Sequence, residues 1–384
     1  MIKVGFIGYR SLVGTVMIQR MLETDFQELE FEPFFFSTSE KEKPSPSHFG
    51  STDSLVIDSF SETDLKKCDI LVSCQGGNYT KSIHPELRQQ GWQGIWLDSA
   101  SALRLKKDST IVLDPLNRPL IEDRLSQGKK DFIGANCTTS LLLMALQGLF
   151  EKKLVKAISG STYQAASGAG SKHIIELLQQ IYFLAQKTGV NPYPAEEKKR
   201  NKNSALELES LATKALKNEK FPREYFKVPL AGNLIPWIDE ENPNFPGSSE
   251  EELKPTRETQ RILNYSRQIP IITTCIRVGT LRCHFQALCV RLKQNLPLDE
   301  IEEIIHWGNQ WVEIIPNNKE ESITRLTPAA ISGSLTIVVG RIRKPDLDGT
   351  GKDLLVYTGG DQLLWGAAEP LHRALRIILE QKMS

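Results

Sequence analysis

The sequence has no long hydrophobic run and no excess of either charge, and each absence excludes a class of protein. No apolar run approaches the ~20 residues that a helix needs to cross a bilayer, so no membrane protein is expected. Basic and acidic residues number 47 each, and this zero net charge gives no support to a nucleic-acid or membrane-surface partner. The N-terminus enters a strand pattern directly, without a signal-peptide layout, which predicts a cytoplasmic protein.

The six cysteines are scattered and include no CxxC pair, so we expect free thiols in a reducing compartment and no metal site. Most such cysteines are small, inert core residues. Cys137 differs in its context, because it stands in "FIGANCTTSLLLMALQGLF" between a short apolar run and a long helical pattern.

A chain of 384 residues is too long for one ordinary core and fits two domains. In the first part, short apolar strands with polar ends alternate with helical or loop segments, which predicts a parallel sheet covered on both faces. Ligands of such sheets lie beyond the carboxyl ends of the strands. A second region begins near Cys137, and the C-terminal helix has an apolar face that can return to the first domain.

Two segments carry further structural expectations. The β-rich segment "IPIITTCIRVGTLRCHFQALCVRLK" predicts a hairpin with its turn at "VGTL". The segment "YPAEEKKRNKN", residues 193–203, is polar and charged, which favours a solvated helix surface or loop.

The first glycine turn, "GYRSLVG", follows a strand and opens a helix, an arrangement that presents backbone N–H groups to a phosphate. It is not a GxGxxG motif, and plain helix–strand packing explains it equally well. The second strand ends in "FSTS", where an NAD site usually has an acid. Hydroxyls there and Arg10 in the turn favour NADP over NAD, and the alternative is a hydroxyl-rich turn without a ligand.

Cys137 is a candidate nucleophile because a thiol at a helix N-terminus has a stabilised thiolate, which lowers its pKa. The alternative is a small buried residue that caps a core helix. A nucleophile needs a base, and both His284 and His173 are candidates that sequence spacing does not separate. Arg277 is seven residues before His284, so the two share a site only if the strand is broken, with Gly279 the obvious place.

Three further residues lie in suggestive places. Gln164 ends a strand before a glycine turn. Glu251 and Lys254 are three residues apart and share one face if their segment is helical, where a surface ion pair is the plainer interpretation. Arg277 is suited to binding a carboxylate through two parallel hydrogen bonds, although an arginine in a strand is more often a solvated edge residue.

Many ordered segments of the chain resemble the aspartate-semialdehyde dehydrogenase family, in its bacterial branch with a long catalytic domain. The segments are "VGFIGYR", "FFSTS", "SCQGG", "GANCTTS", "YQAASG", "PLAGNLIPWID", "RVGTLRCH", "LTPAA" and "GDQLLWGAAEPL". The resemblance implies an α/β Rossmann-like dinucleotide-binding domain of residues 1–136, completed by the C-terminal helix 361–384. It also implies an α+β catalytic and dimerisation domain of residues 137–360 with a large mixed sheet, and a homodimer.

The resemblance also implies the role of each site residue. Cys137 is the nucleophile, His284 the acid/base and Gln164 the residue that orients the acyl group. Arg277 and Glu251 bind the substrate carboxylate and amino group, while Arg104, Lys254 and Asn136 lie at the phosphate. The residues that border NADP are Gly8, Arg10, Ser11, Leu12, Val13, Thr38, Ser39, Gln75, Ser167, Gly168 and Gln362.

The implied reaction is the reversible reductive dephosphorylation of 4-phospho-L-aspartate to L-aspartate 4-semialdehyde through a Cys137 thioester, in lysine, methionine and threonine biosynthesis. The family turn is GxxGxxG, and Ser11 replaces its middle glycine; a left-handed backbone there would cost about 1 kcal/mol or more. Three rivals are N-acetyl-γ-glutamyl-phosphate reductase, a non-catalytic NADP-binding regulator and a cysteine hydrolase.

Overall fold

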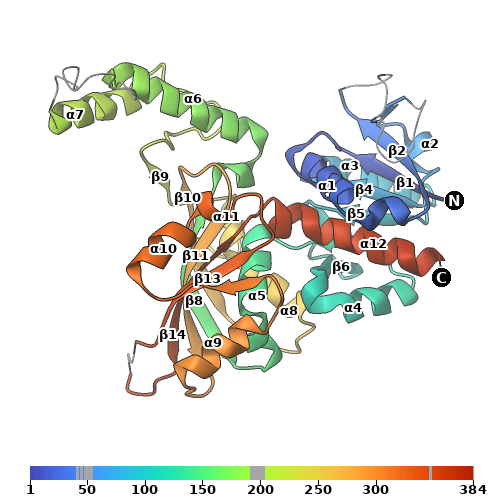
Figure 1. Cartoon of the computed structure of the whole chain (residues 1–384). Coiled ribbons are helices and arrows are strands. Elements are labelled where there is room, and N and C mark those ends of the chain that lie inside the picture. The colour runs from blue at the N-terminus through green and yellow to red at the C-terminus, as the bar shows by residue number, and fades with distance from the viewer. Residues whose placement is uncertain (40–42, 44–45, 47–54, 191–203, 346–347, 384) are drawn as a thin grey trace.

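The computed structural model describes residues 1–39, 43, 46, 55–190, 204–345 and 348–383, which contain two seven-stranded sheets (Figure 1). The first sheet has the order β3-β2-β1-β4-β5-β7-β6, and every pairing in it is parallel. Its strands are β1 (Ile2–Ile7), β2 (Phe31–Ser37), β3 (Ile57–Asp58), β4 (Ile70–Ser73), β5 (Ile95–Asp98), β6 (Ser109–Val112) and β7 (Asp131–Gly134). The expected charged segment 193–203 lies outside the described residues.

Helices cover both faces of this sheet, as the continuous apolar strands predict. One core contains Val4, Val72 and Ile121 together with Leu371 and Ile378 of the C-terminal helix. The opposite core contains buried residues of the two helices that follow β3 and β4. The helices of this part are α1 (Leu12–Glu23), η1 (Asp25–Glu28), α2 (Glu62–Leu65), α3 (Gly77–Gln89), η3 (Ser101–Leu103) and α4 (Asp114–Ser126).

The second sheet is mixed, in the order β12-β13-β14-β11-β8-β10-β9, which confirms the expected fold class. Its strands are β8 (Val155–Gln164), β9 (Leu234–Ile235), β10 (Ile271–Val278), β11 (His284–Leu292), β12 (Val312–Ile314), β13 (Ile337–Arg343) and β14 (Asp353–Gly360). Three helices pack on its inner face: α5 (Cys137–Glu151), α8 (Glu250–Ile262) and α9 (Leu298–His306). Helix α5 is buried on all sides, as its uninterrupted apolar sequence requires.

The predicted hairpin at "VGTL" is wrong, because β10 and β11 are not neighbours. Strand β8 lies between them and pairs with β10 in parallel and with β11 antiparallel. The connection crosses the end of β8, where the carbonyl oxygens of Thr280 and Leu281 accept hydrogen bonds from the backbone N–H groups of Ala166 and Ser167. The apolar alternation of the two strands identified them as strands, but pairing across the chain decided their order.

The outer face of the second sheet is only partly covered. Helices α10 (Lys319–Arg325) and α11 (Pro328–Ile331) cover one end, around Phe285. On the rest of this face, outward-pointing residues alternate along each strand with the buried residues of the inner face. They include Ser159, Ala287 and the exposed Ile272. Helices α6 (Ser171–Thr188) and α7 (Ala205–Leu216) project away from both sheets (Figure 1).

The chain returns to the first sheet at its end. The short helix η4 (Ala166–Ala169) follows the end of β8. The last elements of the chain are η6 (Leu364–Ala368) and α12 (Glu369–Met383). Helix α12 crosses beneath α1 in Figure 1, and Leu371, Leu375 and Ile378 are fully buried in the core of the first sheet. None of the helices among the described residues is long and apolar enough to cross a membrane.

The crossing of α5 and α9 tests this packing. A Cβ at Gly148 would lie 2.0 Å from the carbonyl oxygen of Ile304, so Gly148→Ala must push the two helices apart. We expect the free energy of unfolding to fall by about 1–3 kcal/mol, and the midpoint of thermal unfolding to fall by several degrees in a calorimetric scan. The matched control is Gly77→Ala, whose Cβ would meet only Ala102 at 4.0 Å. Equal midpoints for the two variants would contradict the close helix crossing.

Candidate functional site

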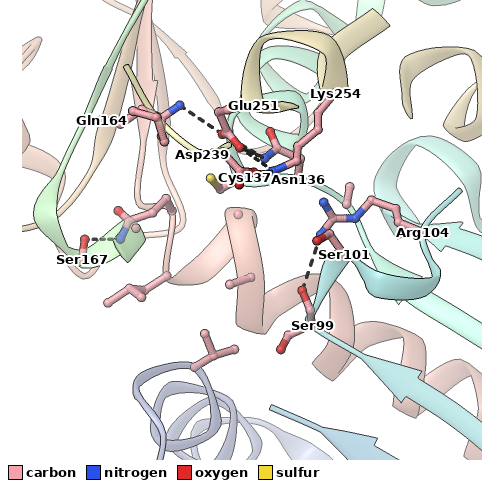
Figure 2. Close-up of a pocket in the computed structure, with 18 of the residues that line it drawn as sticks. Ser99, Ser101, Arg104, Asn136, Cys137, Gln164, Ser167, Asp239, Glu251 and Lys254 are labelled. Atoms are coloured by element: carbon pink, nitrogen blue, oxygen red, sulfur yellow. Dashed lines mark hydrogen bonds and ion pairs between the residues drawn. The ribbon is translucent and has the colours of Figure 1, made fainter. Parts of the chain in front are cut away.

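One cavity of about 400 Å³ lies where the carboxyl ends of the first sheet meet the second sheet, and Figure 2 shows its lining. Its walls come from loops after β5 and β7, from the ends of β8 and β10, and from the helices α1, α8 and η6. The predicted site residues that line it are Val13, Arg104, Asn136, Cys137, Gln164, Ser167, Gly168, Glu251, Lys254, Arg277 and Gln362.

Cys137 is the first residue of α5, as its sequence context predicts. The helix is capped by Asn136, whose Oδ1 accepts hydrogen bonds from the backbone N–H groups of Thr138 and Thr139 at 3.1 Å each. Asparagine is among the preferred residues for this position because its short side chain reaches back to the free N–H groups. The cap fixes the direction in which the helix starts, and so places the thiol at the cavity.

The expected low pKa of this thiol is wrong for the protein without substrate. Burial, together with the negative charge of Glu251, raises the pKa of Cys137 to about 12. The nearby cations Lys254, Arg277 and Arg104 lower the pKa but do not outweigh burial. The resting cysteine is therefore a neutral thiol.

Glu251 is the centre of a buried hydrogen-bond network (Figure 2). Its carboxylate accepts from the Asn136 side-chain amide at 3.0 and 3.1 Å, from Gln164 Nε2 at 3.1 Å and from Lys254 Nζ at 2.8 Å. Although burial opposes ionisation, the charge of Lys254 and these donors lower the pKa of Glu251 to about 2. Glu251 and Lys254 do share one face of α8, where they form a buried ion pair instead of a surface pair.

Arg277 and His284 approach the site from different strands, and both bind the backbone of Ala165. Arg277 Nη1 donates to the carbonyl oxygen of Ala165 at 2.7 Å, and the backbone N–H of Ala165 donates to His284 Nδ1 at 3.1 Å. A Cβ at Gly168 would lie 2.8 Å from His284 Nε2 and 2.9 Å from Arg277 Nη1. The glycine is required because any side chain there would collide with both.

His284 is fully buried and does not line the cavity, although Gly168 above it does. Burial and the charge of Arg277 lower the pKa of His284 to about 3, so the ring is neutral. Since Nδ1 accepts a hydrogen bond, the proton of the neutral ring is on Nε2, which has no partner among the described residues. The alternative base, His173, packs against Tyr225 and Phe226 and is not part of the cavity wall.

Glu258 is a residue that sequence reasoning missed. It is 1 % exposed, accepts a hydrogen bond from the backbone N–H of Asn136 at 2.7 Å and forms an ion pair with Arg104 Nη1 at 3.0 Å. Burial raises the pKa of this carboxyl despite both partners. Its position was visible in the sequence, because residues seven apart lie on one helix face and Glu251 was already a candidate. Asp239, which pairs with Lys254 at 2.7 Å, had no such signal.

The predicted cofactor turn lies beside this cavity. Gly8 has φ +71°, Ser11 caps α1 by accepting from the Gly14 N–H at 3.1 Å, and Val13 reaches the cavity wall. Ser11 itself has φ −63°, so its backbone is not left-handed and carries no such strain. The predicted cofactor residues outside the cavity wall are Gly8, Arg10, Ser11, Leu12, Thr38, Ser39 and Gln75.

One contact joins two strand ends of the first sheet, and a second joins the C-terminal segment to the second sheet. The side-chain amide of Gln75 lies 3.5 Å from Thr38 Oγ1, which joins the ends of β4 and β2. Gln362 donates to the hydroxyl of Ser167 and accepts from the Cys283 N–H at 2.8 Å. The geometry thus places a phosphate-binding type of turn, a thiol and several cations around one cavity.

Two sequence families match the chain: "Semialdehyde dehydrogenase, NAD binding domain" over residues 3–124 and "Semialdehyde dehydrogenase, dimerisation domain" over residues 146–365. An aspartate semialdehyde dehydrogenase structure from Francisella tularensis is 45 % identical, with TM-score 0.92 over 98 % of this chain and 100 % of that one.

Two more distant structures share the fold. Aspartate semialdehyde dehydrogenase II of Vibrio cholerae, complexed with ASA, is 21 % identical, with TM-score 0.76 over 99 % of this chain and 98 % of that one. The Candida albicans enzyme with NADP is 18 % identical, with TM-score 0.62 over 100 % of this chain and 99 % of that one.

The high pKa of Cys137 predicts how the thiol reacts. Alkylation of Cys137 by iodoacetamide, followed by peptide mass spectrometry, should be slow at pH 7 and rise about tenfold per pH unit, because only the thiolate reacts. Glu251→Gln removes a negative charge that raises the pKa of the thiol, so its alkylation at pH 8 should be roughly tenfold faster. Glu250→Gln, at the preceding residue of α8, is the control and should leave the alkylation rate of Cys137 unchanged. Identical profiles for wild type and Glu251→Gln would show that Glu251 does not control the thiol.

Proposed function

The chain belongs to the semialdehyde dehydrogenase family, and we propose that it is an NADP-dependent aspartate-semialdehyde dehydrogenase. It would convert 4-phospho-L-aspartate and NADPH to L-aspartate 4-semialdehyde, phosphate and NADP, reversibly, in the biosynthesis of lysine, methionine and threonine. The observation that carries the proposal is one cavity whose wall contains Cys137, at the capped start of α5, together with the cations Arg277, Arg104 and Lys254. A substrate with a carboxylate at one end and a phosphate at the other matches these cations.

In the first step the Cys137 thiol loses its proton after the substrate has bound, and its sulfur attacks the acyl carbon. The bond from that carbon to the phosphate oxygen breaks, a thioester remains, and the phosphate leaves with the proton as hydrogen phosphate. Arg277 binds the substrate carboxylate, with Nη1 already fixed on Ala165 and the rest of the guanidinium free to face the cavity. Arg104 binds the departing phosphate from a position that Glu258 and the carbonyl oxygen of Gly134 determine. Gln164 orients the acyl group from the end of β8.

Substrate binding must exchange the ion pairs of the resting site. Glu251 and Lys254 neutralise each other at 2.8 Å, and both are assigned to substrate groups of opposite charge. The substrate ammonium group takes the place of Lys254 at Glu251, and Lys254 turns to the phosphate. The same exchange pairs Glu251 with the ammonium group, so its charge opposes thiolate formation at Cys137 less than before.

Bound NADPH supplies a hydride to the carbonyl carbon of the thioester. His284 lies directly behind Gly168 of the cavity wall, and we assign the unpaired Nε2 proton of its neutral ring to the negative charge that develops on the thiohemiacetal oxygen. The backbone N–H groups at the start of α5 are further donors for this oxygen. When the carbon–sulfur bond breaks, the aldehyde leaves, and the Cys137 thiolate takes a proton from water to restore the neutral thiol.

The residues at the first sheet fit a dinucleotide. The left-handed Gly8 and the capped start of α1 form a turn that can hold a pyrophosphate, since free helix N–H groups attract anions. A Cβ at Gly14 would lie 2.3 Å from the carbonyl oxygen of Gly8, so this glycine permits close contact between helix and turn. Thr38 and Ser39 directly follow β2, and their exposed hydroxyl groups can donate hydrogen bonds to the 2′-phosphate of NADP.

We further propose that the uncovered outer face of the second sheet is where a second copy packs. The match to a dimerisation domain, residues 146–365, includes this sheet. The face also exposes apolar side chains that a second copy would bury, such as Ile272, which is 71 % exposed. We also propose the domain division 1–136 with 361–384, and 137–360, which the shared core of α12 and the first sheet supports. All six cysteines are free, which supports a cytoplasmic setting.

The direct test is phosphate-dependent reduction of NADP with L-aspartate 4-semialdehyde. The absorbance of the NADPH that forms measures the rate of hydride transfer. Wild type should be active and Cys137→Ala should lose at least ~10³-fold in kcat, because the covalent route is closed. Cys289→Ser is the control and should keep its activity.

Two outcomes would contradict the proposal in different ways. Activity that survives in Cys137→Ala would remove the thiol from the mechanism. An inactive wild type that still binds NADPH, but reduces NADP with N-acetyl-L-glutamate 5-semialdehyde, would identify the rival acyl phosphate reductase.

The dimer has its own prediction. Ala287 lies on the outer face of β11, and Ala287→Arg would bury an unpaired charge between two copies. We expect dimerisation to weaken by roughly two orders of magnitude in analytical ultracentrifugation. Gln93→Arg, an exposed residue of the first domain, should leave it unchanged. A wild-type monomer, or an unaffected Ala287→Arg dimer, would exclude this face as the interface.

A further inference from the structure

A second cavity lies behind the loop that carries Arg104, outside the site described above. It has a volume of about 340 Å³ and lies between β6, α4 and the end of α8, which are neighbours in the structure (Figure 1). The cations in its wall are Lys107, Arg124, Lys129 and Arg261. One carboxylate, Asp108, lines the cavity with them and is paired with Lys129 at 2.7 Å.

The two arginines of this rear cavity are half-buried and lack carboxylate partners among the described residues. Arg261 uses Nη2 to donate to the carbonyl oxygens of Lys106 at 2.8 Å and Ser109 at 2.6 Å. Arg124 donates to the neutral side chain of Gln127 at 3.1 Å. Both guanidinium groups line the same cavity. Burial and the charge of Arg124 lower the pKa of Arg261, and the charge of Glu258 opposes this effect without outweighing it. An arrangement of this kind is stabilised by an anion between the cations.

We propose that the rear cavity binds an oxyanion with two or more negative charges. Guanidinium groups bind planar or tetrahedral oxyanions through paired N–H groups, and Lys107 adds a flexible point charge at the entrance. Phosphoryl and polycarboxylate ligands share this chemistry. Because the chain has zero net charge, the local excess of cations is a property of this cavity and not of the whole surface.

The rear cavity is connected to Arg104 through the loop between them. Ser109 Oγ donates to the carbonyl oxygens of Leu103 at 2.7 Å and Lys106 at 2.8 Å, and Arg261 holds the same loop from the other side. An anion that draws Arg261 and Arg124 together therefore acts on the loop that positions Arg104. This effect on catalysis rests on the phosphate role proposed for Arg104, whereas binding in the rear cavity does not.

Isothermal titration calorimetry with pyrophosphate tests the binding, and citrate in a parallel titration distinguishes phosphoryl from carboxylate ligands. Arg124→Gln and Lys107→Gln should each weaken the rear-site binding by roughly tenfold or more. The control is Arg118→Gln on the same helix, which removes an arginine paired with Glu122 and absent from the cavity wall. Any binding in the main cavity is common to all variants, so the heat lost only in the first two belongs to the rear cavity.

Equal titration curves for Arg124→Gln, Lys107→Gln and Arg118→Gln would overturn the proposal. Lys107 is exposed, so Lys107→Gln tests it without risk to folding. In steady-state assays, pyrophosphate should change the KM for phosphate more in wild type and in Arg118→Gln than in Arg124→Gln, because any binding in the main cavity adds the same change to all three. A pyrophosphate effect that is the same in all three would place the anion in the main cavity and overturn the connection to Arg104.

Discussion

The geometry of the site depends on how Asn136 is held. Its backbone N–H donates to Glu258 and its side-chain amide to Glu251, while its Oδ1 caps the helix that begins with Cys137. Both carboxylates belong to α8, seven residues apart and so on one face of the helix. A helix on the second sheet thereby fixes the residue that follows the first sheet, and the thiol is placed by both halves of the chain. The buried carboxylates are tolerable because each has several donors.

Most charged side chains of the resting site have a partner of opposite charge. Glu251 is paired with Lys254, Glu258 with Arg104, and burial keeps both the Cys137 thiol and the His284 ring neutral. A charged substrate can enter such a site only by exchanging partners with these pairs, because an unpaired charge in a buried cavity is costly. The thiolate is therefore best formed after the substrate has bound, when the charge of Glu251 has a new partner. This order protects a reactive cysteine from solution reagents while the site is empty.

The sequence predicted those features that depend on local pattern. The start of α5 near Cys137 and the parallel first sheet follow from local pattern. The shared face of Glu251 and Lys254 followed only on the condition that their segment is helical, which it is. The order of β10, β8 and β11 did not follow, because strand pairing across distant parts of the chain leaves no trace in the alternation of one strand. The pKa of Cys137 was predicted in the wrong direction, since the helix start was visible in the sequence and the depth of burial was not.

Helix α8 presents different charges to two cavities. Glu251 and Lys254 line the cavity of the thiol, and Glu258 binds the backbone N–H of Asn136 beside it. Arg261, three residues beyond Glu258, lines the rear cavity. A regular helix does not bend readily over one turn, so an anion in the rear cavity cannot move Glu258 and Asn136 without moving the whole helix. The loop around Ser109 is a second path, and it leads to Arg104, which Glu258 connects in turn to Asn136. An anion there would therefore act first on the departure or attack of phosphate, because Arg104 is the residue proposed to bind the phosphate.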